Sequence, residues 1–477
     1  MHKHTKNKTK CLRRLGRVED SAVYQDQYGR PPNGKWPRAA THLACLLLIL
    51  FATHHLSAQD KSAAPFKDIK SFATAPVPKR TPSPPANRPI TLNEAVTIFL
   101  QQNLQLVAAR YDIDLVDAEK LTAGLRPNPE IEVAFSEIPF NGGFYKPQSF
   151  EYGVSQTFEL GGKRQKRIAA ANADSEVARA QFQIVAWQLT NDVKKKFYAV
   201  LLAESLLKLA KENQDTFAEV VKRTNEVFRL GEISGLDLQR LEVEKFKFDT
   251  DVANSERDFE LALRDLRFVL GGDYRAMNIE VAGSIEYYEP YDFSLSDLRD
   301  KAMAARPDLK AAQLSERAAN ASIKLQNSQK IPDLTLGAGI EELAMGGSTY
   351  NVGFSIPIPI FNRNQTERAK ALIQRRKAQN DQQYLANQVA SEVEKALVAF
   401  EIQKRRVELY RTGVLTKVTD IQTSTEYALK AGESSILELL DAIRTRRDTL
   451  AGFYQTIFDY QMSLLDLELA TATPLQK

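Results

Sequence analysis

Two stretches of the chain repeat an apolar side chain at every seventh position, and they lie 200 residues apart. The first runs through Val193, Val200, Leu207, Gln214, Val221 and Phe228, and the second through Val393, Phe400, Val407, Val414, Ile421 and Ala428. Only Gln214 interrupts the apolar series. A seven-residue repeat is the seam of a long helix that packs in a left-handed coiled coil. The sequence therefore predicts two long helices in a duplicated architecture.

The first 58 residues are predicted to be a signal sequence with an extended n-region. They hold ten Lys or Arg against three Asp or Glu, and an apolar run at 43–52 that is too short to span a bilayer. We expect cleavage near Ala58; the alternative is a buried helix segment. Residues 59–90 contain seven prolines and are predicted to be an extended linker. Without the first 58 residues the net charge is −3, which gives no support for a nucleic-acid partner.

Both cysteines and all five histidines lie within these 58 residues. The rest of the chain therefore offers no thiolate or imidazole for a disulfide, a metal site or the usual nucleophile and base of a hydrolase. An enzyme restricted to carboxylates, Lys and Tyr is the remaining alternative. We expect no enzymatic activity, no cofactor and no metal site.

From residue 91 onward the pattern predicts the same order of elements twice. The first repeat, 91–272, is predicted to contain a helix that ends near Leu125, a hairpin at 129–158, a long helix at 162–229, a tip and a helix at 236–270. The second repeat, 295–470, is predicted to contain a helix, a hairpin at 332–358, a long helix at 364–430, a tip and a helix at 435–470. Residues 273–294 form an irregular connector and 471–477 a tail. Thr91 and Glu94 form a capping box that starts the first helix.

Four basic residues follow Gly161-Gly162 at the start of the first long helix: Lys163, Arg164, Lys166 and Arg167. The stretch lacks the upstream glycine and the Ser or Thr after Lys that a phosphate-binding loop requires. We interpret these cations as basic residues at a turn near a membrane interface.

The two hairpins alternate apolar with small or polar residues, and each strand is about ten residues long, which suits a tilted transmembrane strand. The side chains expected to face lipid are Ile131, Val133, Phe135, Phe150, Tyr152, Val154, Leu334, Leu336, Tyr350, Val352, Phe354 and Ile356. The alternative is a small soluble sheet covered by helices. Four strands cannot close a barrel, and a barrel in lipid has no open edge, so several protomers must contribute strands. Three protomers would supply twelve strands, but the residues alone do not choose three over two or four.

Three segments carry a resemblance to a known family: 126–130 (RPNPE), 155–164 (SQTFELGGKR) and 356–365 (IPIPIFNRNQ). With the repeated order of elements, they resemble the TolC family of outer-membrane efflux channels across 91–470. The last two segments are similar to the CzcC-like branch, which serves heavy-metal efflux. The resemblance implies a mostly α chain with a small β part. It also implies a homotrimer with a shared twelve-stranded transmembrane barrel and a coiled-coil periplasmic tunnel.

The resemblance further implies a location in the outer membrane, in contact with its lipid. The partners that it implies are a periplasmic adaptor (membrane fusion) protein and an inner-membrane RND-type pump. Such a channel performs no chemistry itself.

In this family the helical tips close the channel and dock the adaptor. The resemblance places the periplasmic gate at Glu438, Asp441, Asp237 and Tyr427. It places adaptor contacts at Leu230, Gly231, Glu232, Ser234, Ala431, Gly432, Glu433 and Ser435. The alternative is that Ser435 with Glu438, and Ser234 with Asp237, only cap helices, and that Asp441 is a solvated surface acid. The basic residue that latches the closed state in the best-known member is replaced by Ser434, so a latch must use other groups, such as Lys430 with Asp237 or Glu232.

Two classes of function remain. The first is an exit duct for efflux, with heavy-metal cations as the expected cargo and with drug efflux or type I secretion as alternatives in the same family. The second is a periplasmic coiled-coil scaffold without a pore. The hairpins favour the first class, because a scaffold has no need of them.

Overall fold

The computed structural model describes residues 89–136, 149–230, 233–271, 279–285, 291–343 and 346–475. All of them belong to the second of two compact units, Phe72–Lys477. The predicted signal sequence, nearly all of the linker, and part of the connector and tail lie outside the described residues. Gly231, Glu232 and the side chains of Phe135 and Lys430 also lie outside them. None of the described helices combines the length and apolar character needed to cross a bilayer.

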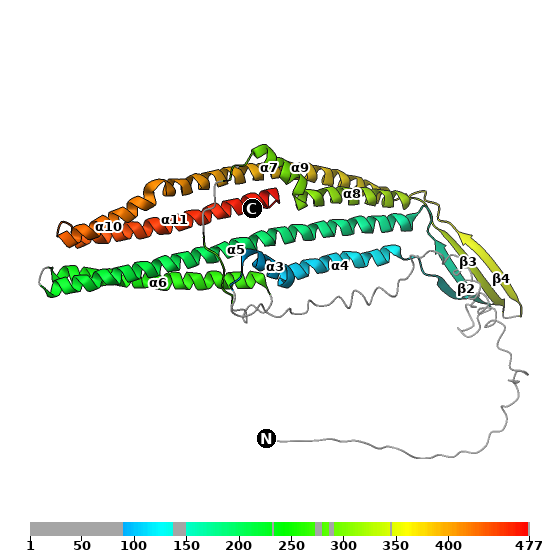
Figure 1. The fold of residues 1–477 in the computed structure, drawn as a ribbon. Helices are drawn as coiled ribbons and strands as arrows, with labels where there is room; N and C mark the ends of the chain where they lie inside the picture. The colour runs from blue at the N-terminus through cyan, green and yellow to red at the C-terminus, as the bar shows by residue number, and fades with distance from the viewer. Residues whose placement is uncertain are drawn as a thin grey trace, which may run out of the picture. The chain divides into compact units, whose positions relative to one another are not determined.

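The described elements follow the predicted order of two repeats (Figure 1). The first repeat contains α3 (Leu92–Gln102), α4 (Leu104–Gly124), β1 (Glu130–Ser136), β2 (Ser149–Phe158), α5 (Lys163–Arg229) and α6 (Gly235–Leu270). The second contains α7 (Leu295–Ala305), α8 (Pro307–Ser328), β3 (Leu334–Leu343), β4 (Ser348–Ser355), α9 (Gln365–Leu409), the π-helical turn η1 (Tyr410–Val414), α10 (Leu415–Ala431) and α11 (Ile436–Thr471). The helix α5 has 67 residues and spans about 100 Å at 1.5 Å per residue.

The four strands form one antiparallel sheet in the order β1-β2-β3-β4. Directly paired residues project to the same face of an antiparallel sheet. The register aligns Ile131, Val154, Ala338 and Val352 in one row, and Val133, Tyr152, Ile340 and Tyr350 in the next. The opposite face carries Glu132, Gly153, Gly339 and Asn351 in the row between. The sheet thus has one polar face and one mainly apolar face, which also carries Gln156 and Glu342 toward its ends. The outer edges of β1 and β4 have no partner strand within the described chain.

The predicted lipid-facing residues whose side chains are described within the strands share the mainly apolar face, but they are not equally exposed in the single chain. Val352 on the edge strand β4 is 86% exposed, whereas Val154 on the inner strand β2 is 6% exposed. Ile356 was placed in a strand by its alternation with neighbours, and this was wrong, because β4 ends at Ser355. The physical reason is Pro357, which has no N–H for a ladder.

Each repeat opens with two helices where one was predicted, so these two predictions were wrong. Asn103 ends α3 in an extended conformation, and its Oδ1 accepts from Leu106 N–H at 2.9 Å, which caps α4. Its Nδ2 donates to the Val269 carbonyl at 2.7 Å. In the second repeat the break falls at Arg306, because a residue before proline avoids the helical region and Pro307 suits the first position of α8.

The basic residues after Gly162 point inward and hold the junction between sheet and helices. Arg164 Nε donates to the Gly124 carbonyl at 2.7 Å, and Arg167 donates to the carbonyls of Ala123 and Leu125 at 2.9 and 2.7 Å. These bonds satisfy carbonyls at the C-terminal end of α4 that have no helical partner. The buried ammonium of Lys163 pairs with Asp333 at 2.7 Å. The sequence did not predict these contacts.

The second heptad seam holds only for its first half. Val393, Phe400 and Val407 are buried in the main core, but Val414 and Ile421 are 41% and 51% exposed. The prediction of one uninterrupted helix and seam over 364–430 was therefore wrong. The cause is η1, where Gly413 adopts φ 122° and an extra residue is taken up by a π turn.

Removing the cap at Asn103 should destabilise the helical body. We expect Asn103→Ala to lower the free energy of unfolding by about 1–2 kcal/mol, because the N-cap bond to Leu106 and the bond to Val269 are both lost. Thermal unfolding followed by circular dichroism measures this. Asn93→Ala, at an exposed helical position, is the matched control and should change little; equal stability of the two variants would contradict the assigned cap.

Candidate gate at the helical tips

Two helical hairpins end at the side of the molecule opposite the sheet (Figure 1). The α10–α11 turn is built on Gly432, which ends α10 at φ 75°. Gly432 N–H donates to the Leu429 carbonyl at 3.1 Å, and Glu433 N–H donates to the Ala428 carbonyl at 2.9 Å. A glycine in the left-handed conformation closes helices in this way because it has no side chain to clash. Ala431, Gly432, Glu433 and Ser435 are exposed, as is Leu230 on the other tip.

Glu438 completes a capping box with Ser435 at the start of α11. Its Oε2 accepts from the Ser435 N–H at 3.0 Å, while its own N–H donates to Ser435 Oγ at 3.3 Å. The hydroxyl of Ser434 donates to the same carboxylate, so Ser434 helps to orient this acid. The hydrogen bond from Ser434, followed by the bond from the Ser435 backbone, lowers the pKa of Glu438.

Asp237 has a matching arrangement at the start of α6. Ser234 caps the helix by accepting from Asp237 N–H at 3.2 Å, and its hydroxyl donates to the Asp237 carboxylate at 2.8 Å. Arg240 lies 3.4 Å from the same carboxylate. Capping therefore accounts for the positions of Asp237 and Glu438. It does not account for Asp441 or Tyr427, which are exposed on α11 and α10.

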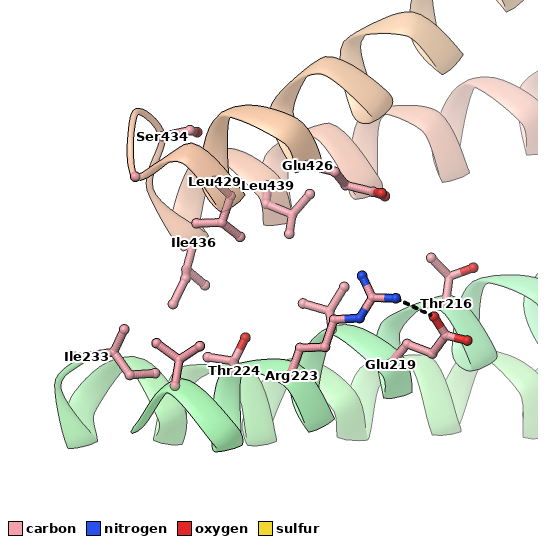
Figure 2. A pocket seen from close by; sticks show the side chains of 13 residues that line it. Thr216, Glu219, Arg223, Thr224, Ile233, Glu426, Leu429, Ser434, Ile436 and Leu439 are labelled. Carbon is pink, nitrogen blue, oxygen red and sulfur yellow. Dashed lines mark hydrogen bonds and ion pairs between the residues drawn. The ribbon is translucent and has the colours of Figure 1, made fainter. Parts of the chain in front are cut away.

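A cavity of about 440 Å³ separates the two hairpins of one chain at this end. In Figure 2, Leu429, Ile436 and Leu439 from the α10–α11 hairpin face Ile233 and Thr224 from the α5–α6 hairpin. Arg223 and Glu219 form an ion pair at 3.4 Å along one wall. Beside this cavity the hairpins meet in an apolar cluster, in which Leu429 and Ile436 pack against buried residues that include Phe217 and Leu439. In the described part of the chain there is no cluster of three His, Cys, Asp or Glu side chains that could hold a metal ion.

An ion pair farther from the tips, between a buried acid and a partly exposed arginine, joins the hairpins. We call the pair Arg444 and Glu244 the clamp. Arg444 of α11 donates through two nitrogens to the Glu244 carboxylate of α6, with Nε–Oε1 at 2.8 Å. The Glu244 side chain is only 5% exposed, and Lys247 lies 3.0 Å from it. The hydrogen bond from Arg444 lowers the pKa of Glu244, and the same bond raises the pKa of Arg444.

The clamp is flanked by a second pair and an apolar cluster. Arg447 binds Asp251 at 3.0 Å, and its guanidinium lies 5.6 Å from the ring centre of Phe248. Phe248 stacks on Phe217, in a cluster that includes Leu439 and Leu440 of the other hairpin. The sequence analysis missed the clamp. The available signal was an acid within an apolar helical stripe, since Leu241, Glu244, Phe248 and Val252 are all buried along α6.

The predicted latch partners are only partly described. Asp237 pairs with Arg240 of its own helix, while Glu232 and the side chain of Lys430 lie outside the described residues. Among the described residues, the clamp is the ionic contact that links the two hairpins nearest to the tips.

Comparison with known proteins identifies the family. A family model described as "Outer membrane efflux protein" matches residues 96–272 and 298–472, one segment for each repeat. The cobalt-zinc-cadmium resistance protein CzcC of Cupriavidus metallidurans is 26% identical over 361 residues, which cover 75% of this chain and 84% of that protein. The outer membrane protein TolC of Vibrio cholerae is 21% identical over 326 residues, which cover 65% of this chain and 74% of that protein.

The fold matches as well. A crystal structure of the channel CusC superposes with a TM-score of 0.67 at 19% identity, covering 80% of this chain and 92% of that one. The expected TolC-like fold, mostly α with a small antiparallel sheet and two repeats, is therefore confirmed. Because the family model covers most of the chain in two consecutive repeats, this protein belongs to the outer membrane efflux protein family.

Proposed function

We propose that this protein is the outer-membrane exit duct of a tripartite efflux system for heavy-metal cations. The observation that carries the duct is the four-stranded sheet with one apolar face and two unpaired edges. Three copies of this sheet, joined edge to edge as a homotrimer, supply twelve strands and leave no open edge in lipid. The apolar row through Val352 and Ile131 then faces lipid, and the polar row through Asn351 faces the lumen.

The metal cargo is supported by the likeness to CzcC, whose name assigns it to cobalt, zinc and cadmium resistance. After residue 58 the chain has no Cys or His, the ligands that soft and borderline metal ions prefer. Selection of the metal therefore belongs to the partners, an inner-membrane RND-type pump and a periplasmic adaptor. The proposed contacts of the adaptor are the predicted tip residues that the structure describes as exposed, namely Leu230, Ser234, Ala431, Gly432, Glu433 and Ser435.

The acids at the tips would form a charged ring in a trimer. Glu438 and Asp441 are three positions apart and share one side of α11, so three copies bring six carboxylates to the opening. The lowered pKa of Glu438 keeps its carboxylate ionised to a lower pH than an ordinary glutamate. A ring of this kind favours cations over anions. The clamp replaces the missing basic latch by holding α11 against α6.

The cargo is tested by metal tolerance of a strain that lacks the gene. We expect deletion to reduce tolerance to cobalt, zinc and cadmium salts, and the wild-type chain to restore it. Deletion of the cognate pump should give the same loss and is the control. Normal metal tolerance together with new drug sensitivity would overturn the proposal that metal ions are the cargo, but it would not contradict the proposal that the protein is an exit duct.

The charged ring is tested by conductance in planar bilayers. We expect Glu438→Gln combined with Asp441→Asn to weaken block by divalent and trivalent cations and to alter the open probability, because the opening loses all six charges. Glutamine retains the capping box, so the first turn of α11 stays formed. Asp420→Asn, an exposed acid on α10, should leave block unchanged. Equal block in all three proteins would remove Glu438 and Asp441 from the gate.

The clamp is tested by Arg444→Met. Glu244 is then left buried with Lys247 as its one remaining cation, so we expect a loss of about 2 kcal/mol in unfolding free energy and more frequent channel opening. Arg446→Met removes a cation from the same helix and is the matched control.

The clamp should also depend on pH in one direction. The pKa of Glu244 is lower in the folded state than in the unfolded state. Its contribution to stability is therefore fully present above the unfolded-state pKa and is lost as the pH falls through the folded-state pKa. Wild-type opening should therefore be insensitive to pH between about 5 and 8 and should rise only below the ordinary carboxyl pKa of about 4.3. A rise in opening near pH 6 would assign the latch to another group.

A further inference from the structure

A second cavity lies on the sheet side of the clamp, where α5 packs against both α6 and α11 (Figure 1). Its volume is about 300 Å³, a size at which protein cavities hold small organic molecules. One wall consists of four residues of α5 at helical spacing, namely Leu206, Leu209, Ala210 and Asn213. Residues of α6 and α11 form the other walls. A molecule in this cavity would therefore contact both repeats of the chain.

The most buried residues that line the cavity are apolar, with the exception of one amide. Leu209 and Phe248 are 5% and 1% exposed, and Asn213 is 3% exposed. Nδ2 of Asn213 is buried and has no hydrogen-bond partner among the described residues. A buried donor that has given up its hydration without a new partner is unfavourable. Asn213 is thus a donor that an acceptor oxygen in the cavity would satisfy.

The charged residues of the lining leave the cavity with a net negative charge. They are Asp251, Arg447 and Asp448, two acids and one base, which gives a charge of −1. The guanidinium of Arg447 binds Asp251 Oδ2 at 3.0 Å and Asp448 Oδ1 at 2.9 Å. Each acid therefore keeps a second oxygen that can accept. The side chains of Asp251 and Asp448 are 43% and 68% exposed, so this charge lies at the rim and favours the entry of a cation.

The surroundings of these acids suit an organic cation better than a metal ion. Mg²⁺ and Ca²⁺ require about six oxygen ligands, whereas here the positive group of Arg447 lies between the two carboxylates. The walls beside them carry the alkyl groups of Leu206 and Ala451. Alkyl groups attached to a charged nitrogen can pack on such walls while the charge stays close to the acids and to water.

We infer that this cavity binds a small organic cation that carries one acceptor oxygen. The ammonium group lies at the rim near Asp251 and Asp448, and the oxygen accepts from Asn213 Nδ2. The alkyl part of the ligand packs on Leu206 and Leu209. A ligand held in this way contacts α5, α6 and α11 together and joins the two repeats beside the clamp. The site is built from side chains of one chain and goes beyond the proposed duct.

Three probes of matched shape test the two polar contacts separately. Acetylcholine has both the charge and the ester oxygens, pentyltrimethylammonium keeps the charge alone, and 3,3-dimethylbutyl acetate keeps the ester alone. We expect pentyltrimethylammonium to bind about tenfold more weakly than acetylcholine, because it cannot accept from Asn213. The neutral ester should bind about threefold more weakly, because it lacks the attraction of the acids. Equal affinities of the two cations would mean that water satisfies Asn213 as well as the ligand does, and would overturn the proposal.

Binding is read from a fluorine label on the full-length protein in lipid nanodiscs. The label is attached through Asn254→Cys, at an exposed position of the lining, in a protein whose two native cysteines, Cys11 and Cys45, are changed to Ser. We expect its resonance to shift with the concentration of acetylcholine and to saturate. The same label at Thr366→Cys, an exposed position near the start of α9, should not shift. A resonance at residue 254 that does not shift, or that shifts without saturation, would overturn the site.

Asn213→Leu removes the donor and keeps a side chain of similar size. We expect this variant to bind acetylcholine and pentyltrimethylammonium equally, because the tenfold difference comes from the bond to Asn213. Altered packing alone would change both affinities together and would leave their ratio as it is. A preference for acetylcholine that survives in this variant would overturn the assigned donor. The comparison of the three probes on the wild-type chain decides the proposal if Asn213→Leu does not fold.

Asp448→Asn tests the charge at the rim. We expect it to weaken the binding of both cations about threefold and to leave the binding of the neutral ester unchanged. Asp466→Asn, at an exposed acid of α11 outside the cavity, is the matched control and should change none of the three affinities. Equal loss in the two variants would reduce the effect to the total charge of the protein and would overturn the role of Asp448.

The binding site and the duct are tested by different measurements. A protein that prefers acetylcholine as expected but forms no channel in planar bilayers would refute the proposed duct and keep the site. A protein that conducts but binds none of the probes would refute the site and keep the duct.

Discussion

Backbone hydrogen bonding in lipid is the constraint on which this architecture depends. Water cannot satisfy an open strand edge within hydrocarbon, and the chain carries four strands with free edges at β1 and β4. Other copies must therefore pair with both edges. The proposed ring of three copies would place six long helical hairpins below one barrel, since each chain brings two.

The junction between sheet and helices depends on charges that are used internally. Arg164 and Arg167 bind the last carbonyls of α4, and Lys163 binds Asp333 ahead of β3, so one helix start ties together both repeats. Such contacts fix the direction in which the helices leave the sheet. At the other end the clamp and the stacked rings of Phe217 and Phe248 have the equivalent role between the hairpins. Polar and packing contacts thus hold the helices together near both of their ends.

The sequence predicted the order of elements and the apolar face of the sheet because both follow from regular periods. It failed where a single polar residue redirects the chain. Asn103 lies inside a helical pattern and ends the helix only because Val269 and Leu106 meet its side chain, which no local pattern reveals. The break at Arg306 did have a local signal in Pro307. The clamp had only a weak local signal, which is the acid Glu244 among apolar residues on α6. Its partner Arg444 lies 200 residues away in the sequence.

Glu438 shows how a folding signal and a charge can be the same group. Its carboxylate is oriented by Ser434 and the Ser435 backbone, within the turn that begins α11. The orientation of this carboxylate is therefore set by the start of the helix and does not require a bound ion. In the proposed gate, a channel mouth whose charges are oriented in advance would present the same negative field to every cargo, whether the hairpins stand together or apart.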